Sequence, residues 1–128
     1  MFLCTYMHTG ATMRDFIRAV RAISDETRIR ILKVLLQREC CVCEVMQALD
    51  IAQSRASRNL GILEGAGFIE SRRDGLWIVY SINEQIVDGY AASLIEMLRN
   101  SLVNEQIILQ DRERLSHAVR VGLRATGK

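Results

Sequence analysis

Cysteines are the most chemically distinctive residues of this 128-residue chain, because Cys40, Cys41 and Cys43 fall within four positions. The fourth cysteine, Cys4, lies far upstream. Thiols crowded in this way cannot close separate loops, so they do not form the disulfide framework of a small secreted domain. Thiolates are the ligands that soft metal and metalloid ions prefer. The cluster therefore predicts a soft-ion site made of reduced thiols, and we expect a cytoplasmic protein.

The cluster stands at the start of a short expected helix within residues 38–50, where apolar residues recur at helical spacing. A helix N-terminus favours a thiolate because its N–H groups have no partners within the helix. At about 100° per residue, Cys40 and Cys43 project within roughly 60° of each other, whereas Cys41 and Cys43 diverge by roughly 160°. On this geometry an ion that needs both Cys41 and Cys43 must distort the helix start, which would make the site a switch.

A second group of side chains suited to binding opens the expected helix over residues 53–64. Residues 53–59 contain no carboxylate, and the members of this group are Gln53, Ser54, Arg55, Ser57, Arg58 and Asn59. Arg pairs with guanine, Gln and Asn pair with adenine, and Ser reaches bases or phosphates. Arg72 and Arg73 stand just before the turn of an expected hairpin nearby. The helix and hairpin together favour double-stranded DNA as a partner over an ordinary exposed polar surface.

Hydrophobic periodicity predicts the elements that position these residues. Two helices are expected between residues 13 and 37, followed by helices over 42–49 and 53–64. Strands are expected over 68–73 and 76–82, with Asp74-Gly75 between them as a type I′ turn. One long helix is then expected from about residue 84 to 114. This order is that of a winged helix-turn-helix, mainly α with a β-hairpin wing, in which the 42–49 and 53–64 helices form the DNA-binding pair.

Composition limits the remaining classes of function. Hydrophobic residues make up 49% of the chain and charged residues 25%, which is typical of one soluble domain. We expect a flexible arm over 1–12, the domain over 13–114 and a basic tail over 115–128. No apolar run approaches the roughly 20 residues of a membrane span, so no membrane partner is expected. No nucleophile–base pair can be proposed, so neither an enzyme nor an organic cofactor is expected.

The segments 23–32, 39–45, 53–60, 63–69 and 72–80 resemble, in their order and spacing, the ArsR/SmtB family of metalloregulatory repressors. The resemblance extends over about residues 13–100, and Cys41-Val42-Cys43 resembles the ion-binding box of the arsenic-responsive branch. It implies a homodimeric repressor that binds operator DNA. The outer helices, near 13–23 and 84–110, would form the dimer. The inducer would be As(III) or Sb(III), bound by thiolates and releasing the protein from DNA.

The chain departs from that branch at one ligand position. Met46 stands where the box commonly has a third cysteine, so the third thiolate would be Cys40 or Cys4. Because a cadmium- and lead-sensing branch uses N-terminal cysteines, a Cd/Pb-responsive repressor that combines Cys4 with the 40–43 cysteines is an alternative. Asp111 and His117 do not match the Asp/His set of the zinc- and cobalt-sensing members.

Two further hypotheses stay open. Neighbouring thiols could sense oxidation instead of an ion, which would retain DNA binding but change the signal. The chain could also be a metal-binding chaperone or metal buffer without a DNA role. In that case replacement of Arg58 would leave every activity unchanged.

Overall fold

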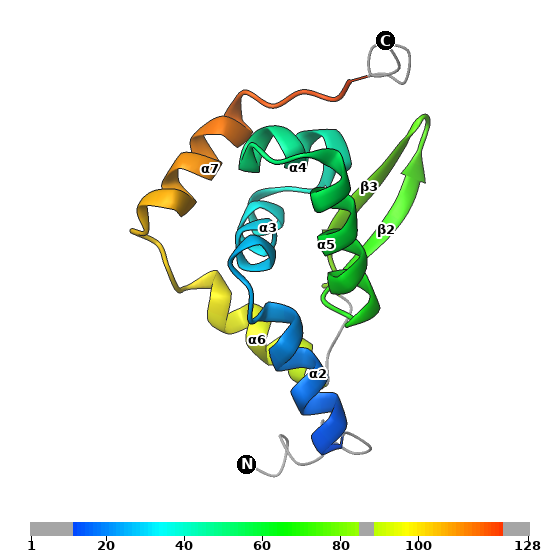
Figure 1. Ribbon diagram of the computed structural model, residues 1–128, viewed down its shortest axis with the longest axis vertical. Helices are drawn as coiled ribbons and strands as arrows, with labels where there is room; N and C mark the ends of the chain where they lie inside the picture. The colour runs from blue at the N-terminus through cyan, green and yellow to red at the C-terminus, as the bar shows by residue number, and fades with distance from the viewer. Residues whose placement is uncertain (1–11, 85–88, 122–128) are drawn as a thin grey trace.

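The computed structural model describes residues 12–84 and 89–121, which form a mainly α fold with one small antiparallel sheet (Figure 1). The first helices are α2 (Met13–Ile23), α3 (Glu26–Gln37), α4 (Val42–Leu49) and α5 (Gln53–Gly65). The strands are β1 (Cys40–Cys41), β2 (Ile69–Asp74) and β3 (Trp77–Ile82). Helices α6 (Tyr90–Arg99) and α7 (Gln106–Ser116) follow the hairpin. The helices expected before residue 65 and both hairpin strands are therefore present.

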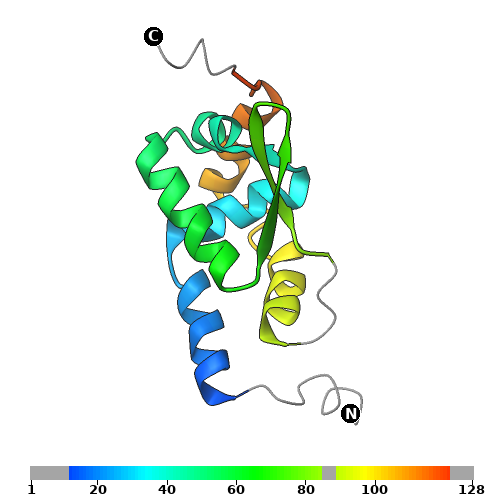
Figure 2. The ribbon, with the colours of Figure 1, turned by 90° about the vertical axis from the view of Figure 1, so that its right-hand side faces the viewer.

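Helices α4 and α5 form the helix-turn-helix pair, and the hairpin of β2 and β3 lies beside α5 (Figures 1 and 2). Asp50 ends α4 in the left-handed region, with a φ of 58°, so the chain turns sharply before α5 begins. The sheet has the order β1-β3-β2, in which β1 pairs with the second strand of the hairpin. Helix α3 contacts each of the other helices. This arrangement confirms the expected winged helix-turn-helix.

The turn of the hairpin differs by one residue from the expected one. Asp74 is still part of β2 and pairs with Trp77, so the loop consists of Gly75 and Leu76. Gly75 has a φ of 65°, but Leu76 has no positive φ, and a type I′ turn needs one at both central residues. The predicted type I′ turn is therefore wrong, although Gly75 does supply the left-handed residue of this turn.

The long helix expected from about 84 to 114 is interrupted, and residues 100–105 separate α6 from α7. Lys33 on α3 stabilises the interruption, because its Nζ donates to the carbonyl oxygens of Leu98 at 2.9 Å and Ser101 at 2.7 Å. Leu102 then adopts a φ of 59°, which a continuing right-handed helix cannot accommodate. Helix α7 packs on α3 and α4 instead of extending α6. The prediction of one outer helix over 84–110 is therefore wrong. Of the two helices, only α6 lies at the outer position that was expected for it.

A buried ion pair fixes α7 to the domain. Arg30 on α3 donates from Nε to Asp111 Oδ2 and from Nη2 to Asp111 Oδ1, both at 2.8 Å. Arg114 donates to the same carboxylate at 2.9 Å and, through Nε, to the carbonyl oxygen of Ala48 on α4. Because these groups are hydrogen-bonded on several sides, their burial does not leave an uncompensated charge.

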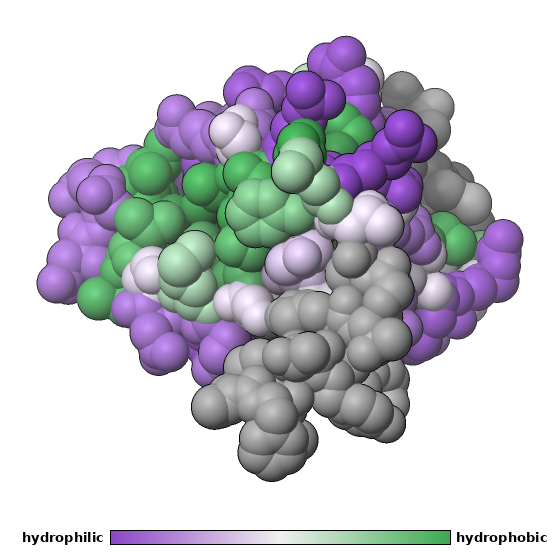
Figure 3. Space-filling view, turned by 90° about the horizontal axis from the view of Figure 1, so that it is seen from below, coloured by the Kyte–Doolittle hydropathy of each residue, from purple (hydrophilic) through white to green (hydrophobic). Residues whose placement is uncertain are grey.

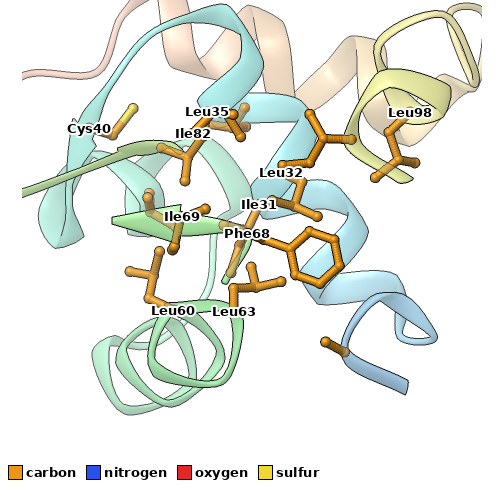
Figure 4. Close-up of a cluster of buried hydrophobic side chains, with 14 of the residues drawn as sticks. Ile31, Leu32, Leu35, Cys40, Leu60, Leu63, Phe68, Ile69, Ile82 and Leu98 are labelled. Atoms are coloured by element: carbon orange, nitrogen blue, oxygen red, sulfur yellow. The ribbon is translucent and has the colours of Figure 1, made fainter. Parts of the chain in front are cut away.

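The hydrophobic core lies between α3, α5 and the hairpin (Figure 4). Its fully buried members include Leu32 on α3, Leu60 and Leu63 on α5, and Phe68 just before β2. Cys40 belongs to the same buried cluster. The core therefore determines the place of α5, which as the second helix of a helix-turn-helix is its recognition helix, and of one of the three clustered cysteines.

Candidate functional site

The cysteine cluster spans a strand and the start of a helix instead of lying within one helix. Cys40 and Cys41 form β1 and pair with Tyr80 and Val79 of β3, and α4 begins only at Val42. Cys41 is the N-cap of α4 and has extended backbone angles. The projections calculated for a continuous helix therefore do not apply, and the prediction that Cys41 and Cys43 diverge is wrong.

The sulfurs of Cys41 and Cys43 lie 2.6 Å apart at the first turn of α4. Cys41 is buried and Cys43 is half-buried. Burial and the hydrogen bond with Cys43 raise the pKa of the Cys41 thiol to about 12, so this thiol is protonated at neutral pH. One soft ion can contact both sulfurs without unwinding the helix, contrary to the expected distortion.

Cys40 points away from this pair. Successive residues of a strand face opposite sides, so Cys40 enters the core, where its exposed fraction is 0%. Burial raises the pKa of its thiol to about 12, and its sulfur donates to the carbonyl oxygen of Arg38 at 3.5 Å. Cys4 lies outside the described residues. Within residues 12–84 and 89–121, no group of three His, Cys, Asp or Glu side chains could hold a metal ion.

Charged groups surround the Cys41–Cys43 pair, and they are not among the site residues predicted from the sequence. Glu44 accepts the backbone N–H of Cys41 at 2.9 Å and forms ion pairs with Arg38 at 2.9 Å and Arg120 at 3.4 Å. Burial alone would raise the pKa of Glu44, but the hydrogen bonds from Cys41 and Arg38 lower it overall. Val121 N–H donates to the sulfur of Cys43 at 3.4 Å. No local pattern indicates this last contact, because the two residues are 78 positions apart.

The polar face of α5 is largely exposed at its N-terminal half, where the exposed residues are Gln53, Ser54, Arg55, Ser57 and Arg58. Ala52 caps the helix without a side-chain hydrogen bond. Asn59 differs from the other predicted contacts, because it is buried. Its amide donates to the carbonyl oxygen of Arg55 and accepts from Arg28 Nη1 at 2.9 Å. Asn59 therefore braces α5 against α3 and is not part of the exposed face.

The two wing arginines are in different environments. Arg72 is held by Glu39 in a bidentate ion pair with distances of 2.7 and 2.8 Å. Arg73 is exposed, and neither it nor Arg58 forms an ion pair within the part of the chain that the structure describes. Arg55 on α5 also forms no ion pair there, and it donates to the hydroxyl of Thr27 at 2.8 Å. The unneutralised positive charge of α5 and the wing is therefore carried by Arg55, Arg58 and Arg73.

An exposed apolar surface covers the end of the molecule formed by α2 and α6, on the side seen in Figure 3. Its members are Met13 (76% exposed), Phe16 (46%), Ile17 (41%), Val20 (37%) and Met97 (56%). The ring of Phe16 packs edge-on against Tyr90 at 5.0 Å, which joins the two helices. A patch of this kind on a small domain marks an interaction surface.

Asp111 and His117 do not form a metal site. Asp111 is buried against Arg30 and Arg114, and His117 is exposed and contacts Glu113 at 3.1 Å. In the described part of the chain, no helix combines the length and the hydrophobicity that crossing a membrane would require.

Residues 25–71 match the family model of the bacterial regulatory proteins of the arsR family. The arsenical resistance operon repressor of Escherichia coli (strain K12) is 35% identical over 81 residues, which cover 62% of this chain and 68% of that protein. The cadmium resistance transcriptional regulatory protein CadC homolog of Staphylococcus aureus is 34% identical over 74 residues, 57% of this chain and 61% of that protein.

Among solved structures, the fold is similar to the homodimeric winged helix-turn-helix DNA-binding domain from Mycobacterium bovis. The TM-score is 0.60 at 28% sequence identity, and the match covers 68% of this chain and 77% of that chain. The matched family and fold are those of DNA-binding transcriptional regulators and not of enzymes.

Proposed function

The chain belongs to the ArsR family of bacterial transcriptional regulators, and from this premise we propose a homodimeric repressor that leaves its operator when trivalent arsenic or antimony binds Cys41 and Cys43. One observation carries the proposal. The two sulfurs lie 2.6 Å apart at the first turn of α4, and α4 packs directly against the recognition helix α5. An ion bound there acts on the helix that positions the DNA-reading surface.

The chemistry of binding uses the two thiols directly. Each thiol that bonds to arsenic replaces one hydroxyl of arsenous acid, and the thiol proton leaves with that hydroxyl as water. Cys41 and Cys43 account for two such bonds. Cys40 is not placed to supply the third thiolate, because its side chain lies in the core. That leaves Cys4, among the cysteines, as the proposed source of any third bond.

The DNA-binding surface in this proposal is the exposed N-terminal half of α5 together with the wing. The α5 residues are Gln53, Ser54, Arg55, Ser57 and Arg58, which would enter the major groove. Arg73 and Arg72 would contact the backbone from the wing, Arg72 after leaving Glu39. Asn59 is not included, because its amide is engaged inside the protein.

Dimerisation through α2 and α6 would cover the exposed apolar surface of Met13, Phe16, Ile17, Val20 and Met97. A two-fold dimer places two recognition helices on one face of the duplex, with half-sites about one helical turn apart or a multiple of that. The relative from Mycobacterium bovis is homodimeric, which supports this arrangement.

An anaerobic operator-binding titration tests the proposal. The probe is a fluorescent duplex that the protein itself selects from a random-sequence pool, and binding is followed by anisotropy. Sodium arsenite should weaken binding by about tenfold or more, which is about 1.4 kcal/mol of coupling free energy between the two sites. Complexes that resist arsenite but dissociate with cadmium chloride would support the cadmium alternative instead, for which the Staphylococcus aureus relative is the precedent.

A second candidate signal is oxidation, and the closeness of the Cys41 and Cys43 sulfurs favours it. Joining the two thiols as a disulfide removes two protons and two electrons, which hydrogen peroxide takes up to become two molecules of water. Operator binding that persists with arsenite but is lost with peroxide, and returns with dithiothreitol, would replace the arsenic hypothesis by this one.

A further inference from the structure

The segment after α7 runs past the N-terminus of α4 toward the tip of the wing (Figure 1). Residues 119–121 of this segment are here called the strap. Its first residue, Val119, is held by Gln47 of α4 through two hydrogen bonds, from Gln47 Nε2 to Val119 O at 2.7 Å and from Val119 N to Gln47 Oε1 at 3.1 Å. Its last residue, Val121, donates its N–H to the sulfur of Cys43 at 3.4 Å. Both ends of the strap, Val119 and Val121, therefore contact α4, which is here called the sensor helix.

The same residues also hold the wing. Arg120 pairs with Asp74, the last residue of β2, at 3.1 Å, and its guanidinium lies 5.6 Å from the centre of the Trp77 ring. Trp77 at the start of β3 donates from Nε1 to the carbonyl oxygen of Val121 at 3.0 Å. Arg120 also pairs with Glu44 of α4 at 3.4 Å. Three consecutive residues thus connect the first turns of α4 to the wing tip.

These contacts suit a reversible link. They are mainly polar and close to the surface, and the Val119 side chain is 62% exposed, so little apolar burial holds the strap in place. Segments of this kind open at a lower free energy than the core does. The weak contact at Cys43 is the one that an ion bound at that sulfur must compete with.

We propose that the strap couples the Cys41–Cys43 pair to the wing. Ligation of Cys43 replaces its S–H bond by a bond to the ion, and the ion with its other ligands occupies the space beside the sulfur where the Val121 N–H lies. The strap then leaves α4, and Arg120 and the Val121 carbonyl leave Asp74 and Trp77. The wing then loses the contacts that hold it in the orientation that the structure shows. This inference rests on the proposed function for its ligand, and it makes Gln47, Arg120 and Val121 positioning residues of the sensor.

Trp77 provides a direct readout, because it is the only tryptophan of the chain and is itself a strap contact. Sodium arsenite added to the reduced 128-residue chain should shift the Trp77 emission. It should also speed tryptic cleavage after Arg120 by about fivefold or more, measured by mass spectrometry. A chain ending at Ala118 should show the shifted emission without arsenite, and arsenite should then change nothing further.

Matched variants separate the strap from general effects on folding. Gln47→Ala removes the hydrogen bonds to Val119 and should speed the same cleavage without arsenite. His117→Ala is the control, because His117 is an exposed neighbour that contacts Glu113 and not the sensor helix or the wing. If the chain ending at Ala118 does not fold, judged by circular dichroism, Gln47→Ala still decides the question.

The outcomes distinguish the two hypotheses. Arsenite that binds, as counted by elemental analysis, but leaves the Trp77 emission and the cleavage rate unchanged overturns the strap proposal and leaves the proposed function intact. If arsenite does not bind, the proposed function is wrong, and iodoacetamide then tests the strap alone by placing a carbamidomethyl group on Cys43. An alkylated protein with unchanged Trp77 emission, compared with Cys43→Ser treated in the same way, would also overturn the coupling.

Discussion

The pH dependence of ion binding distinguishes the two main inducer hypotheses. Burial raises the pKa of the Cys41 thiol to about 12, so the thiol carries a proton throughout the physiological range. A cadmium ion must displace that proton to bond to the sulfur. One proton released per ion lowers the dissociation constant about tenfold for each unit of pH, or about 1.36 kcal/mol. Cadmium affinity should therefore rise at least tenfold per unit between about pH 6.5 and 8.

Arsenous acid should behave differently at the same sulfur. Its hydroxyl leaves together with the thiol proton as water, so no proton is released to solvent. The dissociation constant for arsenite should consequently stay constant within about twofold over the same range of pH. The raised pKa of Cys41 therefore works against divalent cations at low pH but imposes no such cost on arsenous acid.

Competition with a chromophoric chelator for cadmium, and with a dithiol for arsenite, measures the two dissociation constants under anaerobic conditions. The slope of each is its change per unit of pH. Cys40→Ala should keep the cadmium slope, because Cys40 faces the core. Cys41→Ser should reduce the dependence by about tenfold per unit of pH, because the Cys41 proton is no longer released. A cadmium affinity that does not change with pH in the unaltered protein would refute the reasoning, since Cys41 would then be a thiolate already or would not be a ligand.

Four substitutions test the remaining parts of the structure. Arg58→Ala should weaken operator binding by about 1–3 kcal/mol in anisotropy titrations, and an unchanged affinity over a salt series would exclude it from the DNA interface. Asp111→Ala leaves Arg30 buried without its partner, so urea denaturation should show a loss of about 3–5 kcal/mol in the free energy of unfolding, and a loss below about 1 would contradict this. Met97→Glu places a charge in the proposed dimer surface and should give monomers in sedimentation velocity, whereas a dimer of unchanged stability would move the interface elsewhere. Cys43→Ser should bind the operator normally and ignore arsenite; loss of operator binding would mean that the cysteine is structural.

The helix-turn-helix and the hairpin could be predicted because their signals are local. The apolar spacing of α4 and α5 and the Gly75 turn act within a few residues, and the folded chain keeps them. The geometry of the cysteines could not be predicted in this way. Cys40 and Cys41 form a strand instead of a helical turn because they pair with Tyr80 and Val79. Local periodicity cannot indicate a strand partner that is so distant in sequence.

The interruption between α6 and α7 has the same kind of cause. The apolar stripe continues across it without proline, but Lys33, far away in sequence, binds the carbonyl oxygen of Leu98 near the end of α6 and that of Ser101 just beyond it. The contacts of the strap are equally remote, since Val121 meets Cys43 across 78 positions. Residues that bind through backbone groups, as Val119 and Val121 do, carry no signature in their side chains.

The basic side chains of α2 and α3 also have a role in the folded chain that the sequence does not indicate. Residues 14–33 carry six basic and three acidic side chains, which is a local excess of positive charge. Much of that charge is directed inward. Arg28 braces Asn59 on α5, Arg30 holds Asp111 on α7, and Lys33 caps α6. The same cations reach α2 and α4, because Arg28 donates to the carbonyl oxygen of Ala22 and Arg30 donates to that of Leu49. Helix α3 therefore uses its cations to hold each of the other described helices in place, which makes it a rigid support. Against such a support, a change at the Cys41–Cys43 pair is relieved most readily through the strap and the wing, which accept no hydrogen bond from these α3 cations among the described residues.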